Sequence, residues 1–345
     1  MYDRGINMET FPVYCTAAIL SSDIFRAHGY IPASLCRDHP LLCTGKPQKA
    51  MRRTLRFFSP LIFLIIFSPT ATGEPAAAPT DALRVMSFNL RYNNPGDGDD
   101  AWPHRKEIVA SMIRFHQADL IGVQEALVGM LDELEMLLPG YARLGVGRAD
   151  GKDGGEFSAI LYRKDRFEVI RQATFWLSDT PDVVASVGWD ASMERIATWG
   201  LFRDRETGRS FYLFNTHFDH KGEEARRESA RLLLRQIDAL AGDAPVLVTG
   251  DFNTPPDSEP YRVLTTGDGA PKKALHDAMT VSRHGHHGPT ATWNGFEAIE
   301  PGRRIDFIFV RGPVEVLQHG ILGETWDGRF PSDHLPVLAE VQIEK

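Results

Sequence analysis

The sequence predicts an α/β fold in which packed β-sheets are flanked by helices. Three observations predict it. Short apolar runs followed by turn residues recur along the chain, as at residues 246–248, where Gly250 follows. Other segments repeat their apolar residues at helical spacing. Many predicted strands follow one another directly, so the order differs from the regular alternation of a doubly wound sheet. We therefore expect one domain, residues 82–345.

The first half of this domain contains two predicted helices and most of the strands. Residues 83–90 and 120–124 are apolar runs of strand length, and residues 105–116 between them are an amphipathic helix. Apolar residues recur at helical spacing again over 128–138. The remaining runs in this half have the length and composition of strands. They are residues 141–146, 158–163, 167–176 and 197–203.

The second half begins with a predicted strand at residues 211–216, which leads into the longest predicted helix, 223–240. Ala230, Leu233 and Ile237 recur in this helix at helical spacing. The later apolar runs are again short and are bounded by turn residues. They are residues 246–248, 305–310, 314–320 and 337–343.

The first 73 residues have the character of a targeting segment. A short basic stretch begins at Met51, an apolar run covers residues 57–67, and small residues follow at 71–73, which is the order of a secretory signal peptide. We interpret 51–73 as a signal peptide for export to the periplasm or the extracellular space. Our hypothesis is that residues 1–50 are an upstream extension of the gene model. The alternative is a membrane anchor with a 50-residue cytoplasmic arm.

The predicted mature part has no cysteine and is acidic. All three cysteines lie in the upstream extension, at positions 15, 36 and 43, so a disulfide or a cysteine nucleophile is excluded from the domain. Residues 74–81 are a Pro/Ala-rich linker. Residues 1–73 hold eight Lys/Arg and four Asp/Glu, so the remaining 30 Lys/Arg and 42 Asp/Glu give a net charge of about −12. This acidity disfavours a processive nuclease.

Polar side chains follow the predicted strands where each apolar run ends. Because strand ends along one sheet edge meet in space, we expect these side chains to collect around a ligand site. Each of them taken alone is also compatible with a cap or a turn. They are Asn89, Glu125, His217, Asp219, Asp251, Asn253, Asp333 and His334.

The residues with the clearest chemistry are Asp251, Asn253 and Asp306. Asp251 and Asn253 lie two apart at a strand end, so both point to the same side. A carboxylate and an amide in that position suit hydrolysis of a charged ester. Asp306 lies inside an apolar run, where an unpaired charge would be costly. A histidine partner would explain it, whereas the alternative is an edge strand with Asp306 in water.

Taken in order, these motifs resemble those of the endonuclease/exonuclease/phosphatase superfamily of metal-dependent phosphoesterases, and the chain looks like a bacterial secreted subgroup of it. The resemblance covers residues 84–343. It implies a deoxyribonuclease I-like, four-layer α/β sandwich, with two mostly antiparallel central β-sheets flanked by helices. The motifs lie at residues 87–89, 124–125, 215–217, 250–253, 304–306 and 332–334.

The resemblance implies a Mg²⁺ (or Mn²⁺) site. Glu125 matches the principal metal ligand, with Asn89 beside it and Asp333 as a further member of the shell. Carboxylate, amide and water ligands suit a hard cation better than zinc. Some abasic-site endonucleases carry an aspartate where this chain has Arg91, so that extra ligand is missing.

The catalytic roles implied by the resemblance fall on five residues. Asp251 orients or deprotonates the attacking water, and Asn253 holds the phosphate oxygens. His334 contacts the scissile phosphate, and Asp306 orients its imidazole. His217 stabilises the phosphate or protonates the leaving oxygen.

Substrate contacts are predicted for Asp219, Arg195, Trp293 and Phe296. The two aromatic residues precede a catalytic strand and are candidates for stacking on a base or sugar. The alternative is that they fill the core. Arg195 is a candidate for binding a second phosphate or, alternatively, a partner in a surface ion pair. Glu156 is a further candidate for lining the site.

We therefore expect an exported, Mg²⁺-dependent phosphoesterase that acts on a phosphodiester in a nucleotide, an oligonucleotide end or another small phosphorylated molecule. The alternatives are a secreted nuclease on DNA or RNA, a sphingomyelinase-type lipid phosphodiesterase and a non-catalytic binding protein. A binding protein would have lost Glu125, Asp251 or His334, and all three are present. We expect a phosphoester substrate, including nucleic acid in the alternative, no stable membrane association after cleavage and no protein partner.

Overall fold

A computed structural model of the chain describes residues 81–344. The predicted upstream extension, the predicted signal peptide and residues 74–80 of the predicted linker lie outside the described residues. Within residues 81–344 no helix is both long and apolar enough to cross a bilayer.

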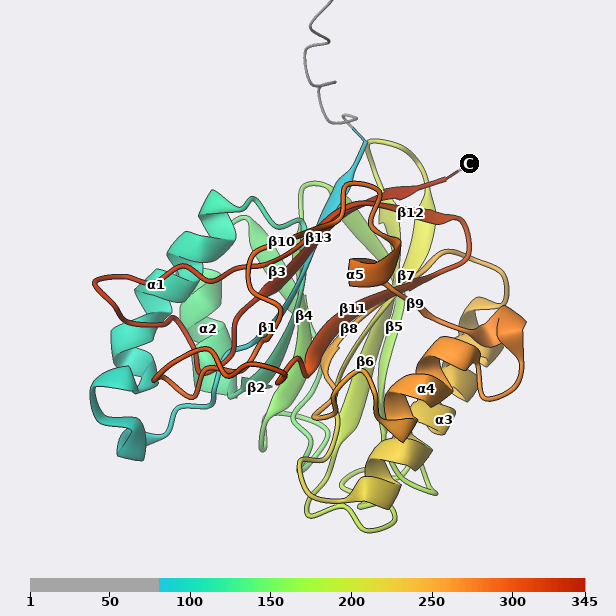
Figure 1. Ribbon diagram of the computed structural model, residues 1–345, viewed down its shortest axis with the longest axis horizontal. Coiled ribbons are helices and arrows are strands. Elements are labelled where there is room, and N and C mark those ends of the chain that lie inside the picture. The colour runs from blue at the N-terminus through green and yellow to red at the C-terminus, as the bar shows by residue number, and fades with distance from the viewer. Residues whose placement is uncertain (1–80, 345) are drawn as a thin grey trace, which may run out of the picture. The chain divides into compact units, whose positions relative to one another are not determined.

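Two β-sheets form the centre of the fold (Figure 1). The strands of the first are β1 (Leu83–Asn89), β2 (Leu120–Ala126), β3 (Tyr141–Leu144), β4 (Phe157–Arg163), β10 (His286–His287), β12 (Val314–Ile321) and β13 (Val337–Ile343). Those of the second are β5 (Phe167–Trp176), β6 (Ile196–Asp204), β7 (Ser210–His217), β8 (Val246–Asp251), β9 (His276–Asp277) and β11 (Asp306–Arg311). Their orders are β10-β12-β13-β1-β2-β4-β3 and β5-β6-β7-β8-β11-β9. Most neighbours are antiparallel, and the parallel pairs are β1–β2, β7–β8 and β10–β12.

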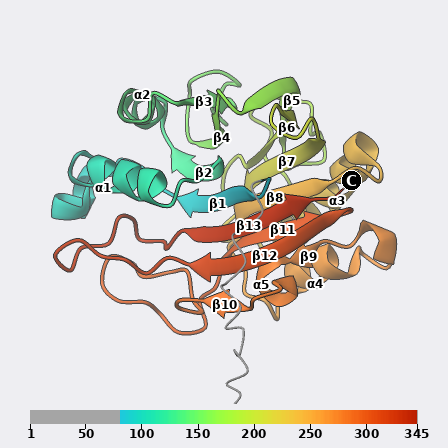
Figure 2. The same ribbon diagram turned by 90° about the horizontal axis from the view of Figure 1, so that it is seen from above.

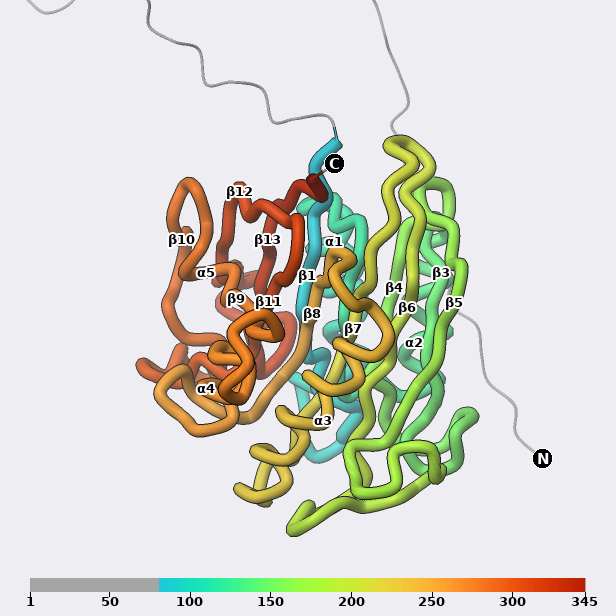
Figure 3. The backbone as a smooth tube through the Cα atoms, turned by 90° about the vertical axis from the view of Figure 1, so that its right-hand side faces the viewer, coloured from blue at the N-terminus to red at the C-terminus, as the bar shows by residue number. Residues whose placement is uncertain are grey.

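Helices cover the outer faces of both sheets, as Figures 2 and 3 show. They are α1 (Trp102–Phe115), α2 (Val128–Leu137), α3 (Glu223–Ala241) and α4 (Glu259–Thr266). The single-turn α5 (Ala278–Val281) instead contacts β11 and β12, and its Ala278 belongs to the core between the sheets. The 3₁₀ segments are η1 (Pro95–Asp100) and η2 (Pro271–Lys273). The pair α1 and α2 packs on the seven-stranded sheet, and the pair α3 and α4 packs on the six-stranded sheet.

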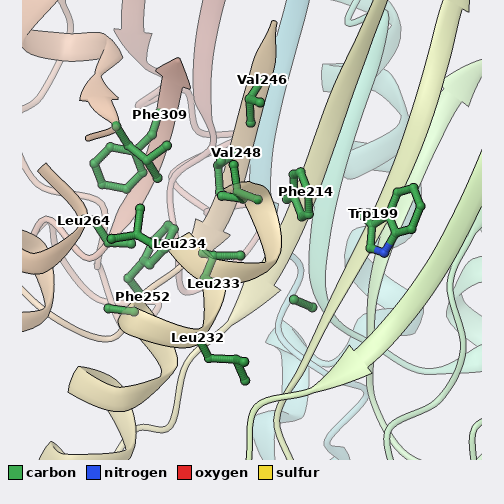
Figure 4. Packing of buried hydrophobic residues seen from close by; sticks show 14 of the residues in the cluster. Trp199, Phe214, Leu232, Leu233, Leu234, Val246, Val248, Phe252, Leu264 and Phe309 are labelled. Atoms are coloured by element: carbon green, nitrogen blue, oxygen red, sulfur yellow. The ribbon is translucent and has the colours of Figure 1, made fainter. Parts of the chain in front are cut away.

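Three buried apolar clusters hold the two sheets and the two helix pairs together. One lies between α1, α2 and the first sheet, one between the two sheets, and one between the second sheet and α3 with α4, which Figure 4 shows. Burial of apolar surface is the main force that stabilises such layers. Representative members in that order are Ile113 and Ile121, then Val85 and Leu213, then Leu233 and Leu264. The predicted four-layer sandwich is confirmed.

The predicted strands and helices in this region are all present, with small shifts at their ends. The first helix starts at Trp102 instead of residue 105, because Pro103 is compatible with the first turn of a helix. The elements that were not predicted are short: α4, α5, the two-residue strands β9 and β10, and the 3₁₀ segments η1 and η2.

A buried polar network joins the two sheets just behind the strand ends. The Nε2 of Gln124 donates to Oδ1 of Asn215 at 2.7 Å, and Oγ1 of Thr249 donates to the same oxygen at 3.0 Å. Gly122 leaves room for these groups, since a Cβ there would lie 2.5 Å from Asn215 Oδ1 and closer still to Thr249 Oγ1. Buried polar groups that satisfy one another fix a specific arrangement. The network therefore fixes β2 against β7 and β8.

Candidate active site

A cavity of about 510 Å³ opens where β1, β2, β7 and β8 end, away from the C-terminal end of β13. It is lined by Arg91, Tyr92, Glu125, Glu156, Met193, Arg195, His217, His220, Asp251, Asn253, Trp293, Arg303, Asp333 and His334. Most of the predicted site residues are therefore brought to one place. Of the others, Asn89 and Asp306 lie directly behind the wall, whereas Asp219 and Phe296 are not part of the lining.

Asp251 lies at the centre of the site, at the last position of β8. Its Oδ1 accepts a hydrogen bond from the backbone N of Asn253 at 2.9 Å, and its Oδ2 accepts one from Nδ2 of Asn89 at 2.9 Å. The same Oδ2 lies 3.4 Å from Nε2 of His217 and 3.7 Å from Nε2 of His334. Burial and the charge of Asp306 raise the pKa of the Asp251 carboxyl.

His334 is held by a buried carboxylate. Its Nδ1 lies 2.8 Å from Oδ2 of Asp306, and both side chains are buried. Burial alone would lower the pKa of His334, but the charges of Asp306 and Asp251 outweigh it and raise that pKa. The ring of Trp293 lies edge-on to the imidazole, with 4.9 Å between the ring centroids. The imidazole is thus fixed in position and kept protonated, with Nε2 directed towards Asp251.

Asn253 and His217 form a second pair on the cavity wall. Asn253 has a left-handed backbone, φ 48°, which asparagine tolerates well. Its Nδ2 lies 3.1 Å from the carbonyl of Phe218 and 3.0 Å from Nε2 of His217. An amide that donates to Nε2 requires a neutral imidazole, and burial together with Arg195 lowers the pKa of His217 well below its usual value. His217 here orients Asn253, and its predicted contact with the phosphate or leaving oxygen stays a prediction.

The carboxylates of the cavity fit a divalent cation. Ligand atoms of Glu125, His217 and Asp251 lie within 4.8 Å of one another. Burial and the charge of Glu125 raise the pKa of Asp333, which also lines the cavity. A hard cation would offset this concentration of negative charge, and carboxylate oxygens are the ligands it prefers. Glu125 has φ 59°, a strained conformation of the kind found at functional sites.

Asn89 presents its amide group to these carboxylates. Its Nδ2 donates to Oε1 of Glu125 at 3.0 Å as well as to Asp251, and its Oδ1 accepts from the backbone N of Arg91 at 2.9 Å. Because the backbone N–H of Arg91 donates, its partner in Asn89 is the amide oxygen, and the amide nitrogen therefore faces the carboxylates. In this arrangement Asn89 orients Glu125, and its predicted role as a direct metal ligand stays a prediction.

Asp219 is placed differently from what the sequence suggested. Its carboxylate is 1% exposed and accepts from the backbone N of Gly222 at 2.8 Å and from Oγ of Ser192 at 2.8 Å. It also lies 3.4 Å from Nε of Arg195. Because its oxygens are occupied inside the protein, Asp219 holds the loop before α3 and supports Arg195 instead of facing a ligand. The strand β7 ends at His217, so strand alternation no longer directs the side chain two residues later.

Arg195 and the aromatic candidates also differ from one another in placement. Arg195 lines the cavity, and among the described residues its buried Nη1 has no hydrogen-bond partner. Trp293 lines the cavity as well, with the guanidinium of Arg303 4.7 Å from its ring centroid. Phe296 instead packs against the buried Arg105, at 5.2 Å. Phe296 therefore supports the wall and does not form part of it.

Several lining residues were not proposed from the sequence. His220, which lies 2.9 Å from Arg195, and Arg303 come from loops. Arg148, which pairs with the lining residue Glu156 from behind, also comes from a loop. Long polar side chains on loops usually point to solvent, so their type alone gives no signal.

Comparison with known proteins agrees with this geometry. Residues 86–334 match the model of the endonuclease/exonuclease/phosphatase family. A protein of this family from Bacteroides vulgatus is 42% identical, with a TM-score of 0.73 over 76% of this chain and 99% of that one. The mannosyl-6-phosphatase of Bacteroides thetaiotaomicron is 38% identical, with a TM-score of 0.70 over 75% of this chain and 99% of that one.

More distant relatives include nocturnin and Ccr4. Nocturnin of Drosophila melanogaster is 23% identical over 76% of this chain, and the Ccr4 exoribonuclease subunit of Candida albicans is 22% identical over 71%. The matches span 47% and 38% of those proteins, so the chain covers less than half of either.

Proposed function

Because the chain belongs to the endonuclease/exonuclease/phosphatase family and is a hydrolase of phosphoester bonds, we propose that it cleaves a small phosphorylated molecule with the help of Mg²⁺ or Mn²⁺. The observation that carries this proposal is the meeting of Glu125, Asp251 and His334 around one cavity. These three come from β2, β8 and the segment before β13.

Asp251 prepares the attacking water. Its raised pKa makes the carboxylate a better proton acceptor near neutral pH than an ordinary aspartate. The bonds from Asn89 and the backbone of Asn253 fix the direction of both oxygens. Glu125 and Asp333 would hold a divalent cation, which when bound would supply positive charge to the phosphate oxygens.

His334 stabilises the charge that develops on the phosphate. The imidazolium of His334 has Nδ1 occupied by Asp306, which leaves its Nε2–H for a phosphate oxygen. Asn253 lines the same cavity, but its Nδ2 already contacts Nε2 of His217 and the carbonyl of Phe218, so its predicted hold on the phosphate oxygens stays a prediction. Donors that are fixed before the reaction lower the barrier because they need no reorganisation.

The size and charge of the protein favour a small substrate. A cavity of about 510 Å³ is in the range of small-molecule sites. The net charge of about −12 over residues 74–345 disfavours long nucleic acid, whose binding depends on cationic surfaces. The relative from Bacteroides thetaiotaomicron that is 38% identical is a mannosyl-6-phosphatase, which makes sugar phosphates the first substrates to test. A nucleotide phosphodiester is the next.

The decisive experiment is a phosphoester panel with the purified protein. We expect Mg²⁺-dependent release of product from mannose 6-phosphate or bis-p-nitrophenyl phosphate, loss of turnover with EDTA and its return with excess Mg²⁺. His334→Ala should be inactive yet folded. Turnover that is restricted to plasmid DNA or RNA would favour the nuclease alternative, and no turnover of any phosphoester would overturn the proposal.

Export also belongs to this proposal, since residues 51–73 have the order of a signal peptide. N-terminal sequencing of the protein from the periplasm or medium should give a start after residue 73. A mature start upstream of Met51 would contradict it.

A further inference from the structure

The hairpin between β3 and β4 places an ion pair in the cavity wall. Nη1 and Nη2 of Arg148 donate to the two carboxylate oxygens of Glu156 at 2.8 and 2.9 Å. The two side chains are only 13% and 19% exposed, and Glu156 lines the cavity. The two parallel hydrogen bonds hold the guanidinium and the carboxylate in one relative orientation, which their charges alone would not do.

The hairpin itself is rigidly built. The backbone N of Arg148 donates to the carbonyl of Glu156 at 3.1 Å, and the carbonyl of Arg148 accepts from Nε1 of Trp176 at 2.8 Å. At the tip, Oδ1 of Asp150 accepts from the backbone N of Gly154 at 2.9 Å. A ligand that binds this ion pair does not have to order the loop, so less conformational entropy is lost on binding.

Phosphate binding does not explain a carboxylate at this position. Burial and the charge of Glu125 raise the pKa of Glu156, while Arg148 lowers it, so Glu156 stands within the electrostatic reach of the metal site. A carboxylate repels an anionic phosphate, and its presence in the wall points to a neutral part of the substrate. Arg148 uses one lone pair on each oxygen of Glu156, which leaves further acceptor capacity for a ligand donor.

The groups around the pair complete a surface for a hydroxylated ring. Arg195 contributes a guanidinium to the same wall, and its buried Nη1 has no hydrogen-bond partner among the described residues. Glu156 and Arg195 together also line a small neighbouring void. Trp293 contributes an aromatic side chain elsewhere in the lining. Hydroxyl groups both donate and accept, so they suit a wall in which a carboxylate acceptor and a guanidinium donor lie together.

We propose that Glu156, oriented by Arg148 and assisted by Arg195, recognises the hydroxyl groups of a phosphorylated sugar and thereby selects sugar phosphates over other phosphoesters. This inference rests on the proposed phosphoesterase function and adds to it the residues that read the non-phosphate part of the substrate. A site built to bind hydroxyl groups discriminates strongly against analogues that lack them, because its buried polar groups are then left unpaired.

The test compares one substrate with hydroxyl groups to one without them. Kinetics of Glu156→Gln and Glu156→Asp are measured with mannose 6-phosphate and with p-nitrophenyl phosphate at saturating Mg²⁺. We expect kcat/KM for mannose 6-phosphate to fall at least tenfold more than that for p-nitrophenyl phosphate, mainly through KM. The matched control is Asp153→Asn, an exposed carboxylate of the same hairpin, which should stay within twofold of wild type on both substrates.

Four results would overturn the inference. Equal losses on both substrates would make the pair a structural brace, and a tenfold rise in the Mg²⁺ concentration for half-maximal activity would assign Glu156 to the metal shell. A fall in kcat/KM for guanosine 5′-monophosphate alone, with mannose 6-phosphate unaffected, would show that Glu156 recognises a base and not a sugar. If the wild-type protein turns over no substrate, the proposed function fails. Calorimetric titration with mannose 6-phosphate then tests the inference by itself. Equal affinity of wild type and Glu156→Gln for mannose 6-phosphate would overturn it.

Discussion

Asp251 and Asp306 are direct partners across β8 and β11, so two buried carboxylates stand side by side in the antiparallel register. His334 lies against both, with 2.8 Å from Nδ1 to Asp306 and 3.7 Å from Nε2 to Asp251. Like charges this close destabilise each other, and an imidazolium between them offsets the repulsion. The three groups therefore form one electrostatic unit.

Asp306→Asn should lower kcat by on the order of a hundredfold or more. The substitution removes the charge that keeps His334 protonated and weakens the contact that orients its imidazole. Steady-state kinetics at saturating Mg²⁺ measure the effect, with circular dichroism as the check on folding. A kcat within threefold of wild type would mean that the orienting role is wrong.

Glu125→Gln should raise the Mg²⁺ concentration for half-maximal activity at least tenfold. An amide oxygen is a weaker ligand for a hard cation than a carboxylate, and Glu125 contributes to the cluster of ligand atoms described above. Mg²⁺ titrations of activity, supported by calorimetric binding of Mn²⁺, provide the measurement. Glu107→Gln, an exposed change on α1, serves as the control. Identical titration curves for the two variants would rule out Glu125 as a ligand.

Gly122→Ala should destabilise the fold by about 1–3 kcal/mol, or more if the network cannot adjust. The new methyl group would collide with Thr249 and Asn215 between the sheets. Gly129→Ala on α2 is the matched control, because nothing lies within 4 Å of its Cβ position and alanine favours helices. Urea unfolding of both variants gives the free energies, and equal midpoints would show that the inter-sheet packing tolerates the methyl group.

The stability of the fold should fall in mild acid because of His319. Burial lowers the pKa of this side chain from 6.5 to about 4, and its Nδ1 lies 3.0 Å from that of His286. A depressed folded-state pKa contributes stability above pH 6.5 that is lost as the pH falls towards 4, because the unfolded chain takes up the proton first. The full shift corresponds to about 3 kcal/mol. Urea unfolding between pH 7 and pH 4 should show a steeper loss for wild type than for His319→Gln, and parallel curves would contradict this assignment.

The sequence was most informative where apolar runs end in polar residues. The strands before Asn89, Glu125 and Asp251 are buried on both faces, so their apolar composition is required by the core and is visible in the sequence. The polar residue that ends each run is then conspicuous. The convergence of these ends around one cavity could be predicted because the motifs occur in the order of a known family.

What escaped prediction depends on tertiary contacts. Helix α4 has eight residues and a proline near its start, and it is stabilised by packing of Val263 and Leu264 beside α3. The pairing of Arg148 with Glu156 depends on the path of a hairpin that glycine residues allow. Neither local propensity nor motif spacing contains that information.

Two of the site residues, Asp333 and His334, lie just before β13. β13 must also insert between β1 and β12 to complete the first sheet. The strand whose pairing closes the seven-stranded sheet is therefore the one that follows and positions these two side chains. Displacement of β13 from its place would remove Asp333 and His334 from the cavity and open the sheet between β1 and β12 at the same time.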